Sequence, residues 1–247
     1  MAQAFIRFYA ELNYFLPQEQ KQRPVAYPLK GPVAVKHVIE ALGIPHTEVE
    51  LILAHGRPVD FTYPVEPEDR LSVYPAFQAL EPGAEPVLRP ALPSPPCFVI
   101  DNHLGRLATS LRLLGFDALY RNDFDDETLA RLSSEEDRVL LTRDRRLLQR
   151  KVIIYGYCLR TRDPHKQLVA VLRRYRLKGL IQPWQRCLSC NGSLRPVAKE
   201  AIIDRLEPKT KQYFHDFMMC QDCQRIYWQG SHFGPLQGLI ASILAEI

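Results

Sequence analysis

Residues 97–115, CFVIDNHLGRLATSLRLLG, contain the pattern that decides the fold class. The uninterrupted apolar run at 97–100 is typical of a strand buried on both faces, and Asp101 ends it. From Leu104 onward, apolar residues recur at helical spacing, and Gly115 follows them as the expected C-terminal cap. This stretch therefore predicts a buried strand followed by a helix.

The same alternation continues toward the middle of the chain. Further strands are predicted at residues 118–120, 139–142, 152–155 and 158–161, and further helices after Asp125 or Asp126, after Asp144 and after Asp163. Strands that alternate with helices are typical of a parallel sheet. We therefore predict a parallel α/β domain over residues 97–182.

Residues 1–81 carry a different pattern. Strands are predicted at 4–9, 25–29, 51–54 and 70–75, with a helix at 33–42. This order is that of a ubiquitin-like β-grasp domain, and the segment resembles the small sulfur-carrier proteins of thiamine and molybdopterin synthesis. Those carriers act through a free C-terminal Gly-Gly, which the segment lacks. We therefore favour a docking or regulatory module that contacts a protein partner.

A proline-rich stretch separates the two patterns. Six of the 20 prolines of the chain lie in residues 82–96. Proline favours extended polyproline geometry and cannot continue a helix or a central strand. The stretch therefore predicts a semi-rigid linker and a domain boundary.

Composition excludes several classes of protein. Apolar residues make up 46% of the 247 residues and charged residues 24%, which is ordinary for globular domains and excludes wholesale disorder. The longest uncharged apolar stretches are far shorter than the ~20 residues that span a bilayer, and the N-terminus lacks the pattern of a signal peptide. We expect a cytoplasmic protein with no membrane partner.

Charge is distributed unevenly along the chain. Residues 1–81 carry 7 basic and 10 acidic side chains, whereas residues 97–247 carry 24 basic and 17 acidic ones. Arg106, Arg143 and Arg145 lie close to the ends of predicted strands, and arginines suit phosphate backbones. The C-terminal part is therefore expected to bind a polyanion such as a phosphate backbone, although the same charge also fits an ordinary solvated surface.

Carboxylates follow the predicted strands of the α/β domain. Asp101 and Asp144 follow buried strands, Asp163 follows a later one, and Asp126 and Glu127 begin a helix. Ligands of parallel sheets bind at the carboxyl ends of the strands, so we expect these acids at one rim, holding Mg²⁺ or Mn²⁺. Such ions orient water for phosphodiester hydrolysis. A turn-forming or helix-capping role is the alternative, above all for Asp126 and Asp163.

Four of the six cysteines form two tight pairs. Cys187 and Cys190 make one Cys-x-x-Cys knuckle, Cys220 and Cys223 make another, and 29 residues separate the knuckles. Four thiolates in this spacing are typical of a structural Zn²⁺ site, with a redox dithiol as the alternative. We predict a zinc ribbon and C-terminal tail over residues 183–247.

Several segments together resemble the PIN-like RNase family named after the C-terminal domain of the Mut-seven exonuclease. They are residues 101–107, 111–117 and 140–147, the two cysteine knuckles, and residues 227–232. Bacterial members often carry a ubiquitin-like domain in front. The resemblance implies a PIN-like nuclease fold, a zinc ribbon and metal-dependent RNase activity. By position, Asp101 and Asp144 match the metal-binding acids of the family, with Asp126 or Glu127 as the third.

Two segments depart from the pattern of that family. Residues 102–103, Asn-His, and residues 108–110, Ala-Thr-Ser, stand where hydrophobic or aromatic residues are expected.

Our first hypothesis is a metal-dependent endoribonuclease. The alternative is a non-catalytic RNA- or ribosome-binding adaptor with a structural zinc ribbon.

Overall fold

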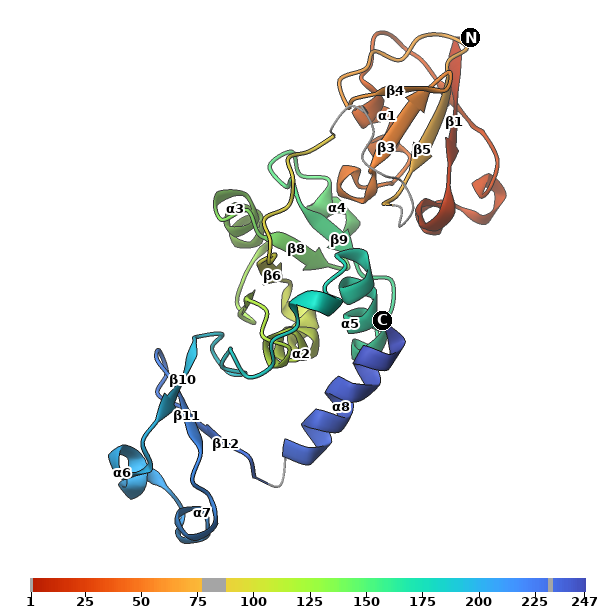
Figure 1. Cartoon of the computed structure of the whole chain (residues 1–247). Helices are drawn as coiled ribbons and strands as arrows, with labels where there is room; N and C mark the ends of the chain where they lie inside the picture. Colours follow the sequence, from red (N-terminus) through yellow and green to blue (C-terminus); the bar gives the residue numbers. More distant parts are fainter. Residues whose placement is uncertain (1, 77–87, 231–232) are drawn as a thin grey trace. The chain divides into compact units, whose positions relative to one another are not determined.

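The computed structural model describes residues 2–76, 88–230 and 233–247, and Figure 1 shows the course of the chain. Residues 82–87 of the predicted linker, and Ser231 and His232 of the last family-like segment, lie outside the described residues. Among the described helices, none combines the length and the apolar character that a membrane crossing requires.

The N-terminal part is a ubiquitin-like β-grasp domain, as predicted. Its five-stranded sheet has the order β2-β1-β5-β3-β4, formed by β1 (Gln3–Phe8), β2 (Val25–Pro28), β3 (Leu51–Ala54), β4 (Arg57–Val59) and β5 (Arg70–Tyr74). The two central strands, β1 and β5, are parallel, and the other pairs are antiparallel. The sequence prediction missed β4, which is only three residues long and pairs with β3 across a tight turn.

Alternating side chains of β1 build the core of this domain. Ala4, Ile6 and Phe8 are at most 1% exposed, while the residues between them are not buried. They share the core with α1 (Val35–Ala41), whose Val35, Val38 and Ile39 are completely buried. Three short 3-10 helices, η1 (Ala10–Phe15), η2 (Gln18–Gln20) and η3 (His46–Glu48), connect the strands.

The middle of the chain forms the predicted parallel sheet, with the order β7-β6-β8-β9. Its strands are β6 (Phe98–Ile100), β7 (Ala118–Tyr120), β8 (Val139–Thr142) and β9 (Gly156–Cys158). Its helices are η4 (Asn102–Leu104), α2 (Gly105–Leu113), α3 (Asp126–Glu135), α4 (Arg145–Leu148), α5 (Pro164–Arg174) and η5 (Lys178–Leu180). All residues of β6 and β8 are buried, as the uninterrupted apolar runs predict.

One strand replaces the two that were predicted at 152–155 and 158–161. The chain turns back after α4, where the Ile153 N–H donates to the Arg150 carbonyl (3.0 Å), and Val152 stays 51% exposed. The ladder with β8 involves Tyr155, whose carbonyl accepts from the Leu140 N–H (3.0 Å), and strand β9 itself is only three residues long. The apolar composition therefore predicted a strand in this segment correctly, but the turn after α4 determines which residues form it.

The C-terminal part contains a three-stranded antiparallel sheet, β10-β11-β12, formed by Leu194–Val197, Phe217–Cys220 and Ile226–Trp228. Two small clusters, one around Cys187, Leu194 and Cys220 and one around Phe217, make its core. Helices α6 (Lys199–Ile202), η6 (Ile203–Arg205) and α7 (Pro208–Tyr213) lie between β10 and β11, and α8 (Phe233–Glu246) ends the chain.

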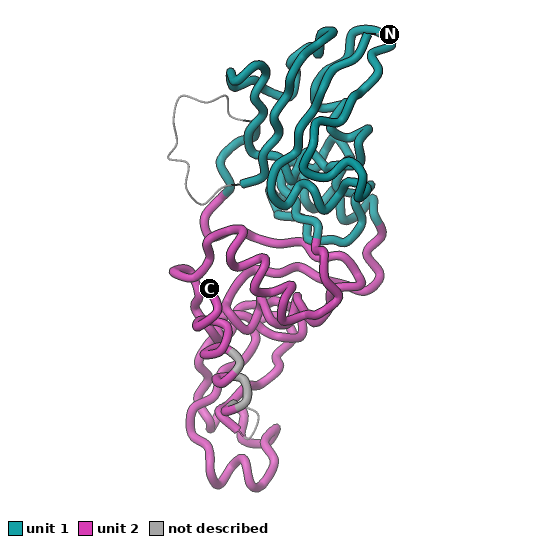
Figure 2. Tube along the Cα trace, turned by 90° about the vertical axis from the view of Figure 1, so that its right-hand side faces the viewer, with its two compact units in different colours: residues 1–92, 126–158 teal, residues 93–125, 159–247 magenta. Residues whose placement is uncertain are grey.

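The chain divides into two compact units, which Figure 2 distinguishes by colour. The first unit contains residues 1–92 and 126–158, and the second contains residues 93–125 and 159–247. The predicted domain boundaries, with a linker at 82–96 and a break between residues 182 and 183, stay predictions.

The backbone of a later segment packs closely against Gly115 at the end of α2. Gly115 has φ +95°, a conformation that favours glycine, and it ends α2 as predicted. A Cβ at this position would overlap the carbonyl of Gln182. The Gln182 N–H in turn donates to the Leu114 carbonyl (3.0 Å), so the chain segment before the first cysteine knuckle is fixed against the end of α2.

Candidate functional site

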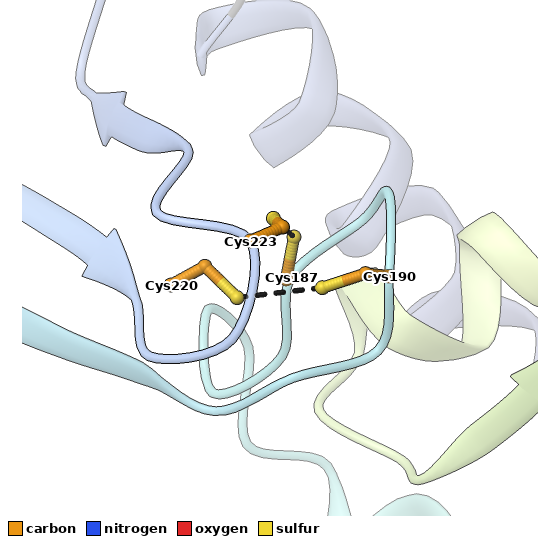
Figure 3. A group of neighbouring side chains, drawn as sticks. All are labelled: Cys187, Cys190, Cys220 and Cys223. Atoms are coloured by element: carbon orange, nitrogen blue, oxygen red, sulfur yellow. Dashed lines mark hydrogen bonds between the residues drawn. The ribbon is translucent and has the colours of Figure 1, made fainter.

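The four knuckle cysteines converge in the second unit. Their sulfur atoms all lie within 4.8 Å of one another, with 3.6 Å between Cys187 and Cys223 and 3.4 Å between Cys190 and Cys220 (Figure 3). Cys187 and Cys220 are buried, whereas Cys190 and Cys223 are exposed. Four thiols at these distances could bind zinc, because thiolate sulfur in a closed set of four is the usual structural zinc environment.

The two knuckles have the same local geometry. The Asn191 N–H donates to the Cys187 carbonyl (2.9 Å), and the Gln224 N–H donates to the Cys220 carbonyl (3.1 Å). Each of these residues follows the second cysteine of its knuckle and has a positive φ, +74° for Asn191 and +59° for Gln224. Each Cys-x-x-Cys sequence is therefore folded into a turn that brings its two thiols to one side.

The environment of the thiols favours negative charge at one of them. Burial opposes ionisation of Cys187, but hydrogen bonds from the Tyr227 hydroxyl and from backbone N–H groups outweigh it and lower its pKa to about 6. Burial and the neighbouring thiols raise the pKa of Cys190 to about 12. Four thiolates this close repel one another unless a cation lies among them, which is the condition that a bound metal satisfies.

The first knuckle is fastened to the α/β part of the same unit by a buried arginine. Arg112 of α2 is 3% exposed. Its guanidinium donates to the carbonyls of Leu188 (3.1 Å) and Ser189 (2.9 Å) inside the knuckle, and to the carbonyl of Ala118 (2.9 Å) at the start of β7. Burial lowers the pKa of Arg112, and negative charge at Cys187 and Cys190 opposes that shift.

Asn191 strengthens the same attachment. Its side-chain oxygen accepts from the Ala118 N–H (2.9 Å), and its amide donates to Asp117 (2.9 Å). Asp117 also pairs with Arg186 (3.2 Å), which directly precedes the first cysteine. Sequence reasoning missed Arg112 and Asn191, because their partners lie more than 70 residues away along the chain.

The predicted acids divide between the two units. In the first unit, exposed Asp144 follows β8 and caps α4, where its Oδ1 accepts from the N–H groups of Arg146 (2.7 Å) and Leu147 (3.4 Å). Asp126 and Glu127 are exposed in the first turn of α3, and Asp126 lies 4.0 Å from Arg150.

In the second unit, Asp101 follows β6 and Asp163 caps α5. The Asp163 Oδ1 accepts from the N–H groups of His165 (2.9 Å) and Lys166 (3.4 Å). Asp101 is half-buried and precedes the short helix η4. In the parts of the chain that the structure describes, one group of three or more potential metal ligands lies close enough to share an ion. That group consists of the four cysteines. A shared metal site of the acids therefore stays a prediction.

The three predicted RNA-binding arginines differ in their surroundings. Arg106 and Arg143 are exposed. Arg145 instead lies against the β-grasp domain within the first unit, with its guanidinium 5.4 Å from the ring centre of Tyr14 and 5.0 Å from that of Phe15. It also donates to the Phe15 carbonyl (3.2 Å).

Further polar contacts join the β-grasp domain to residues 126–158. Glu48 is 2% exposed and accepts from the Cys158 N–H at the end of β9 (2.6 Å). His46, 6% exposed, lies between the Glu40 carboxylate (2.7 Å) and the Ile153 carbonyl (2.8 Å). No local sequence signal identifies the contacts of Glu48 with Cys158 and of His46 with Ile153, because each joins residues about 110 positions apart.

Comparisons with protein families give two matches. The model described as Mut7-C RNAse domain matches residues 96–240, and the model described as Mut7-C ubiquitin matches residues 1–81. No curated protein and no solved structure matches the chain.

Proposed function

The chain belongs to the Mut7-C RNase family, and we propose that it is a metal-dependent ribonuclease that hydrolyses phosphodiester bonds of RNA. The observation that carries this proposal is the RNase family match over residues 96–240, which includes every acid predicted to bind metal. The ubiquitin-like domain precedes it in the expected order.

Asp101 and Asp144 are the proposed main ligands of a catalytic Mg²⁺ or Mn²⁺, with Asp126 or Glu127 and Asp163 as further candidates. The geometry of Asp144 and Asp163 fits such a role. Each uses Oδ1 to cap a helix, and within the described residues neither Oδ2 has a hydrogen-bond partner. A carboxylate held by one oxygen presents the other in a fixed direction, and hard divalent cations prefer carboxylate oxygen.

A bound divalent cation would activate water and polarise the phosphate oxygens. The protein contributes orientation and positive charge. Arg143 directly precedes Asp144, and Arg106 lies five residues after Asp101, so both guanidinium groups are near acids in the chain and exposed to a ligand. Arginine binds phosphate through two parallel hydrogen bonds.

For the four cysteines we propose structural zinc. All four ligands come from the protein, which leaves no open position for substrate. Cysteine thiols must stay reduced to bind zinc, and reduced thiols are typical of the cytoplasm, so the proposed location is the cytoplasm.

A non-catalytic RNA- or ribosome-binding adaptor is the second candidate. The capping bonds of Asp144 and Asp163 support it, because they give both acids a structural role that needs no metal. The adaptor would bind RNA equally well with and without added Mn²⁺, provided that zinc is retained.

The test compares cleavage of labelled single-stranded and structured RNA by the wild type and by Asp144→Asn, with Mn²⁺ present. Asparagine caps helices as well as aspartate does, so this substitution removes the charge and keeps the cap. We expect a loss of more than about 100-fold, since even indirect partners of a metal contribute about 10–100-fold. Asp123→Asn, an exposed acid paired with Arg121, is the control. RNA binding without cleavage by the wild type would support the adaptor instead.

A further inference from the structure

A pocket in the second unit is lined in part by basic side chains. It has a volume of about 420 Å³ and lies between the start of α2 and the start of α5. Its lining includes His103, Arg106, Arg162, Pro164 and Gln167. This volume is within the range of small-molecule sites, about 300–1,000 Å³.

The basic side chains of this pocket lack acidic partners. In the described parts of the chain, His103, Arg106 and Arg162 form no ion pair with a carboxylate, and all three are exposed. Arginines elsewhere do pair with acids, as Arg121 does with Asp123 (2.7 Å). Uncompensated positive charge in a concave surface attracts anions, and guanidinium groups bind phosphate in particular.

Hydrogen bonds fix the backbone of both walls of the pocket. Gln167 is 4% exposed, and its amide donates to the Thr161 carbonyl (2.8 Å), which fixes the turn that carries Arg162. On the opposite wall, the Tyr120 hydroxyl donates to the Asn102 carbonyl (3.0 Å) next to His103. The positions from which the basic side chains extend are therefore set before a ligand binds.

The pocket lies beside two of the proposed metal-binding acids in the sequence. His103 and Arg106 follow Asp101, and Arg162 directly precedes Asp163. A phosphate held by these basic groups would place the neighbouring part of the RNA close to carboxylates of the same unit.

We propose that this pocket binds a phosphate-bearing nucleotide of the RNA substrate, with Arg106 and Arg162 holding the phosphate and His103 beside it. The proposal rests on the proposed ribonuclease function and specifies how its substrate is held. The phosphate is either the 5′-terminal group of the RNA or an internal diester, since the same guanidinium groups suit both.

The experiment measures binding of a short 3′-labelled RNA by fluorescence anisotropy, using the full-length protein without added Mg²⁺ or Mn²⁺. The RNA carries either a 5′-phosphate or a 5′-hydroxyl. We expect Arg106→Gln and Arg162→Gln each to weaken binding about ten-fold, the loss that one charge-assisted hydrogen bond predicts. Lys209→Gln removes one exposed charge from α7, outside the pocket, and is expected to change binding less than about three-fold.

The two RNAs identify the source of the phosphate. If the wild type prefers the 5′-phosphorylated RNA and both arginine variants remove that preference, the pocket binds the terminal phosphate. If both variants weaken the two RNAs equally, it binds an internal diester. Arg162→Lys, which keeps the charge, should restore part of the binding, which shows that the loss in Arg162→Gln is not a folding defect.

Other results overturn the proposal. Wild-type affinity in both arginine variants, losses no larger than that of Lys209→Gln, or absence of RNA binding by the wild type would each do so. Cleavage that persists while Arg106 and Arg162 are dispensable for binding would reject the pocket and leave the ribonuclease. Arginine-dependent binding by a protein that never cleaves RNA would reject the ribonuclease and leave the pocket.

Discussion

The four cysteines and the predicted acids are both candidate metal ligands, yet they differ in what their side chains contact. The cysteine sulfurs lie within 4.8 Å of one another, whereas Asp144 and Asp163 each bind the backbone at the start of their own helix. A thiol is a weak hydrogen-bond donor and acceptor. A carboxylate after a strand, in contrast, accepts hydrogen bonds from backbone N–H groups two or three residues further along the chain.

This difference explains how far each site could be predicted. A Cys-x-x-Cys turn is determined by its own four or five residues, so the spacing alone predicted the cluster. The acids are placed by the ends of separate strands, and each also has a local capping role. Sequence position therefore predicted that Asp144 follows a buried strand and that Asp163 begins a helix, but left open whether they act as ligands.

The largest expected effect is at the cysteines. Cys220→Ser should abolish zinc binding and unfold the C-terminal sheet, because structural zinc sites contribute about 10–16 kcal/mol and Cys220 also lies in the core beside Leu194. Zinc content per protein and thermal unfolding are the measurements. Cys97→Ser, outside the cluster, should keep its zinc. Full zinc content in Cys220→Ser would contradict the site.

A smaller loss is expected at Arg112, which joins the cysteine cluster to α2. Arg112→Met should lower the free energy of unfolding by about 2–4 kcal/mol, because two knuckle carbonyls and the Ala118 carbonyl lose their donor. Chemical denaturation measures the change. Arg131→Met, at an exposed pair with Glu135, is the control and should change stability by less than about 1 kcal/mol.

Glu48 is a buried acid that accepts a backbone hydrogen bond and is not among the predicted metal ligands, so it provides a reference for a purely structural carboxylate. Glu48→Ala should cost about 1–3 kcal/mol of stability, since the buried N–H of Cys158 loses its acceptor. Glu19→Ala, exposed in the same β-grasp domain, should be nearly neutral. Equal stability of the two variants in urea unfolding would show that the contact between the β-grasp domain and β9 contributes nothing.

The smallest effect separates the two roles of Asp144. Asp144→Ala should lower stability by about 1 kcal/mol through loss of the cap, whereas Asp144→Asn should leave stability unchanged. Both variants should lose cleavage equally if the charge matters for catalysis. Cleavage that falls only in the alanine variant would mean that the cap, and not a metal, accounts for the effect.

Most of the fold was predictable because its signals are local. The strand predicted at 97–100, the helix predicted after it and the helix end at Gly115 are all present in the structure. The failure at 152–161 has a physical reason, since a turn after α4 and the bond from Cys158 to Glu48 decide where β9 begins and ends. Contacts such as that of Arg145 with Tyr14 and Phe15 depend on tertiary packing, which residue spacing does not encode.

The bonds of Arg112 have a consequence for how the second unit opens. Arg112 of α2 donates to two carbonyls of the first knuckle and to one carbonyl of β7. Local unfolding of the knuckle therefore leaves this buried guanidinium without two of its three acceptors. Such shared bonds merge neighbouring segments into a single cooperative opening unit. An ion bound by the cysteines would thus slow amide hydrogen exchange in α2 as well as in the knuckle. Metal occupancy could then be followed by the protection of a helix that contributes no ligand.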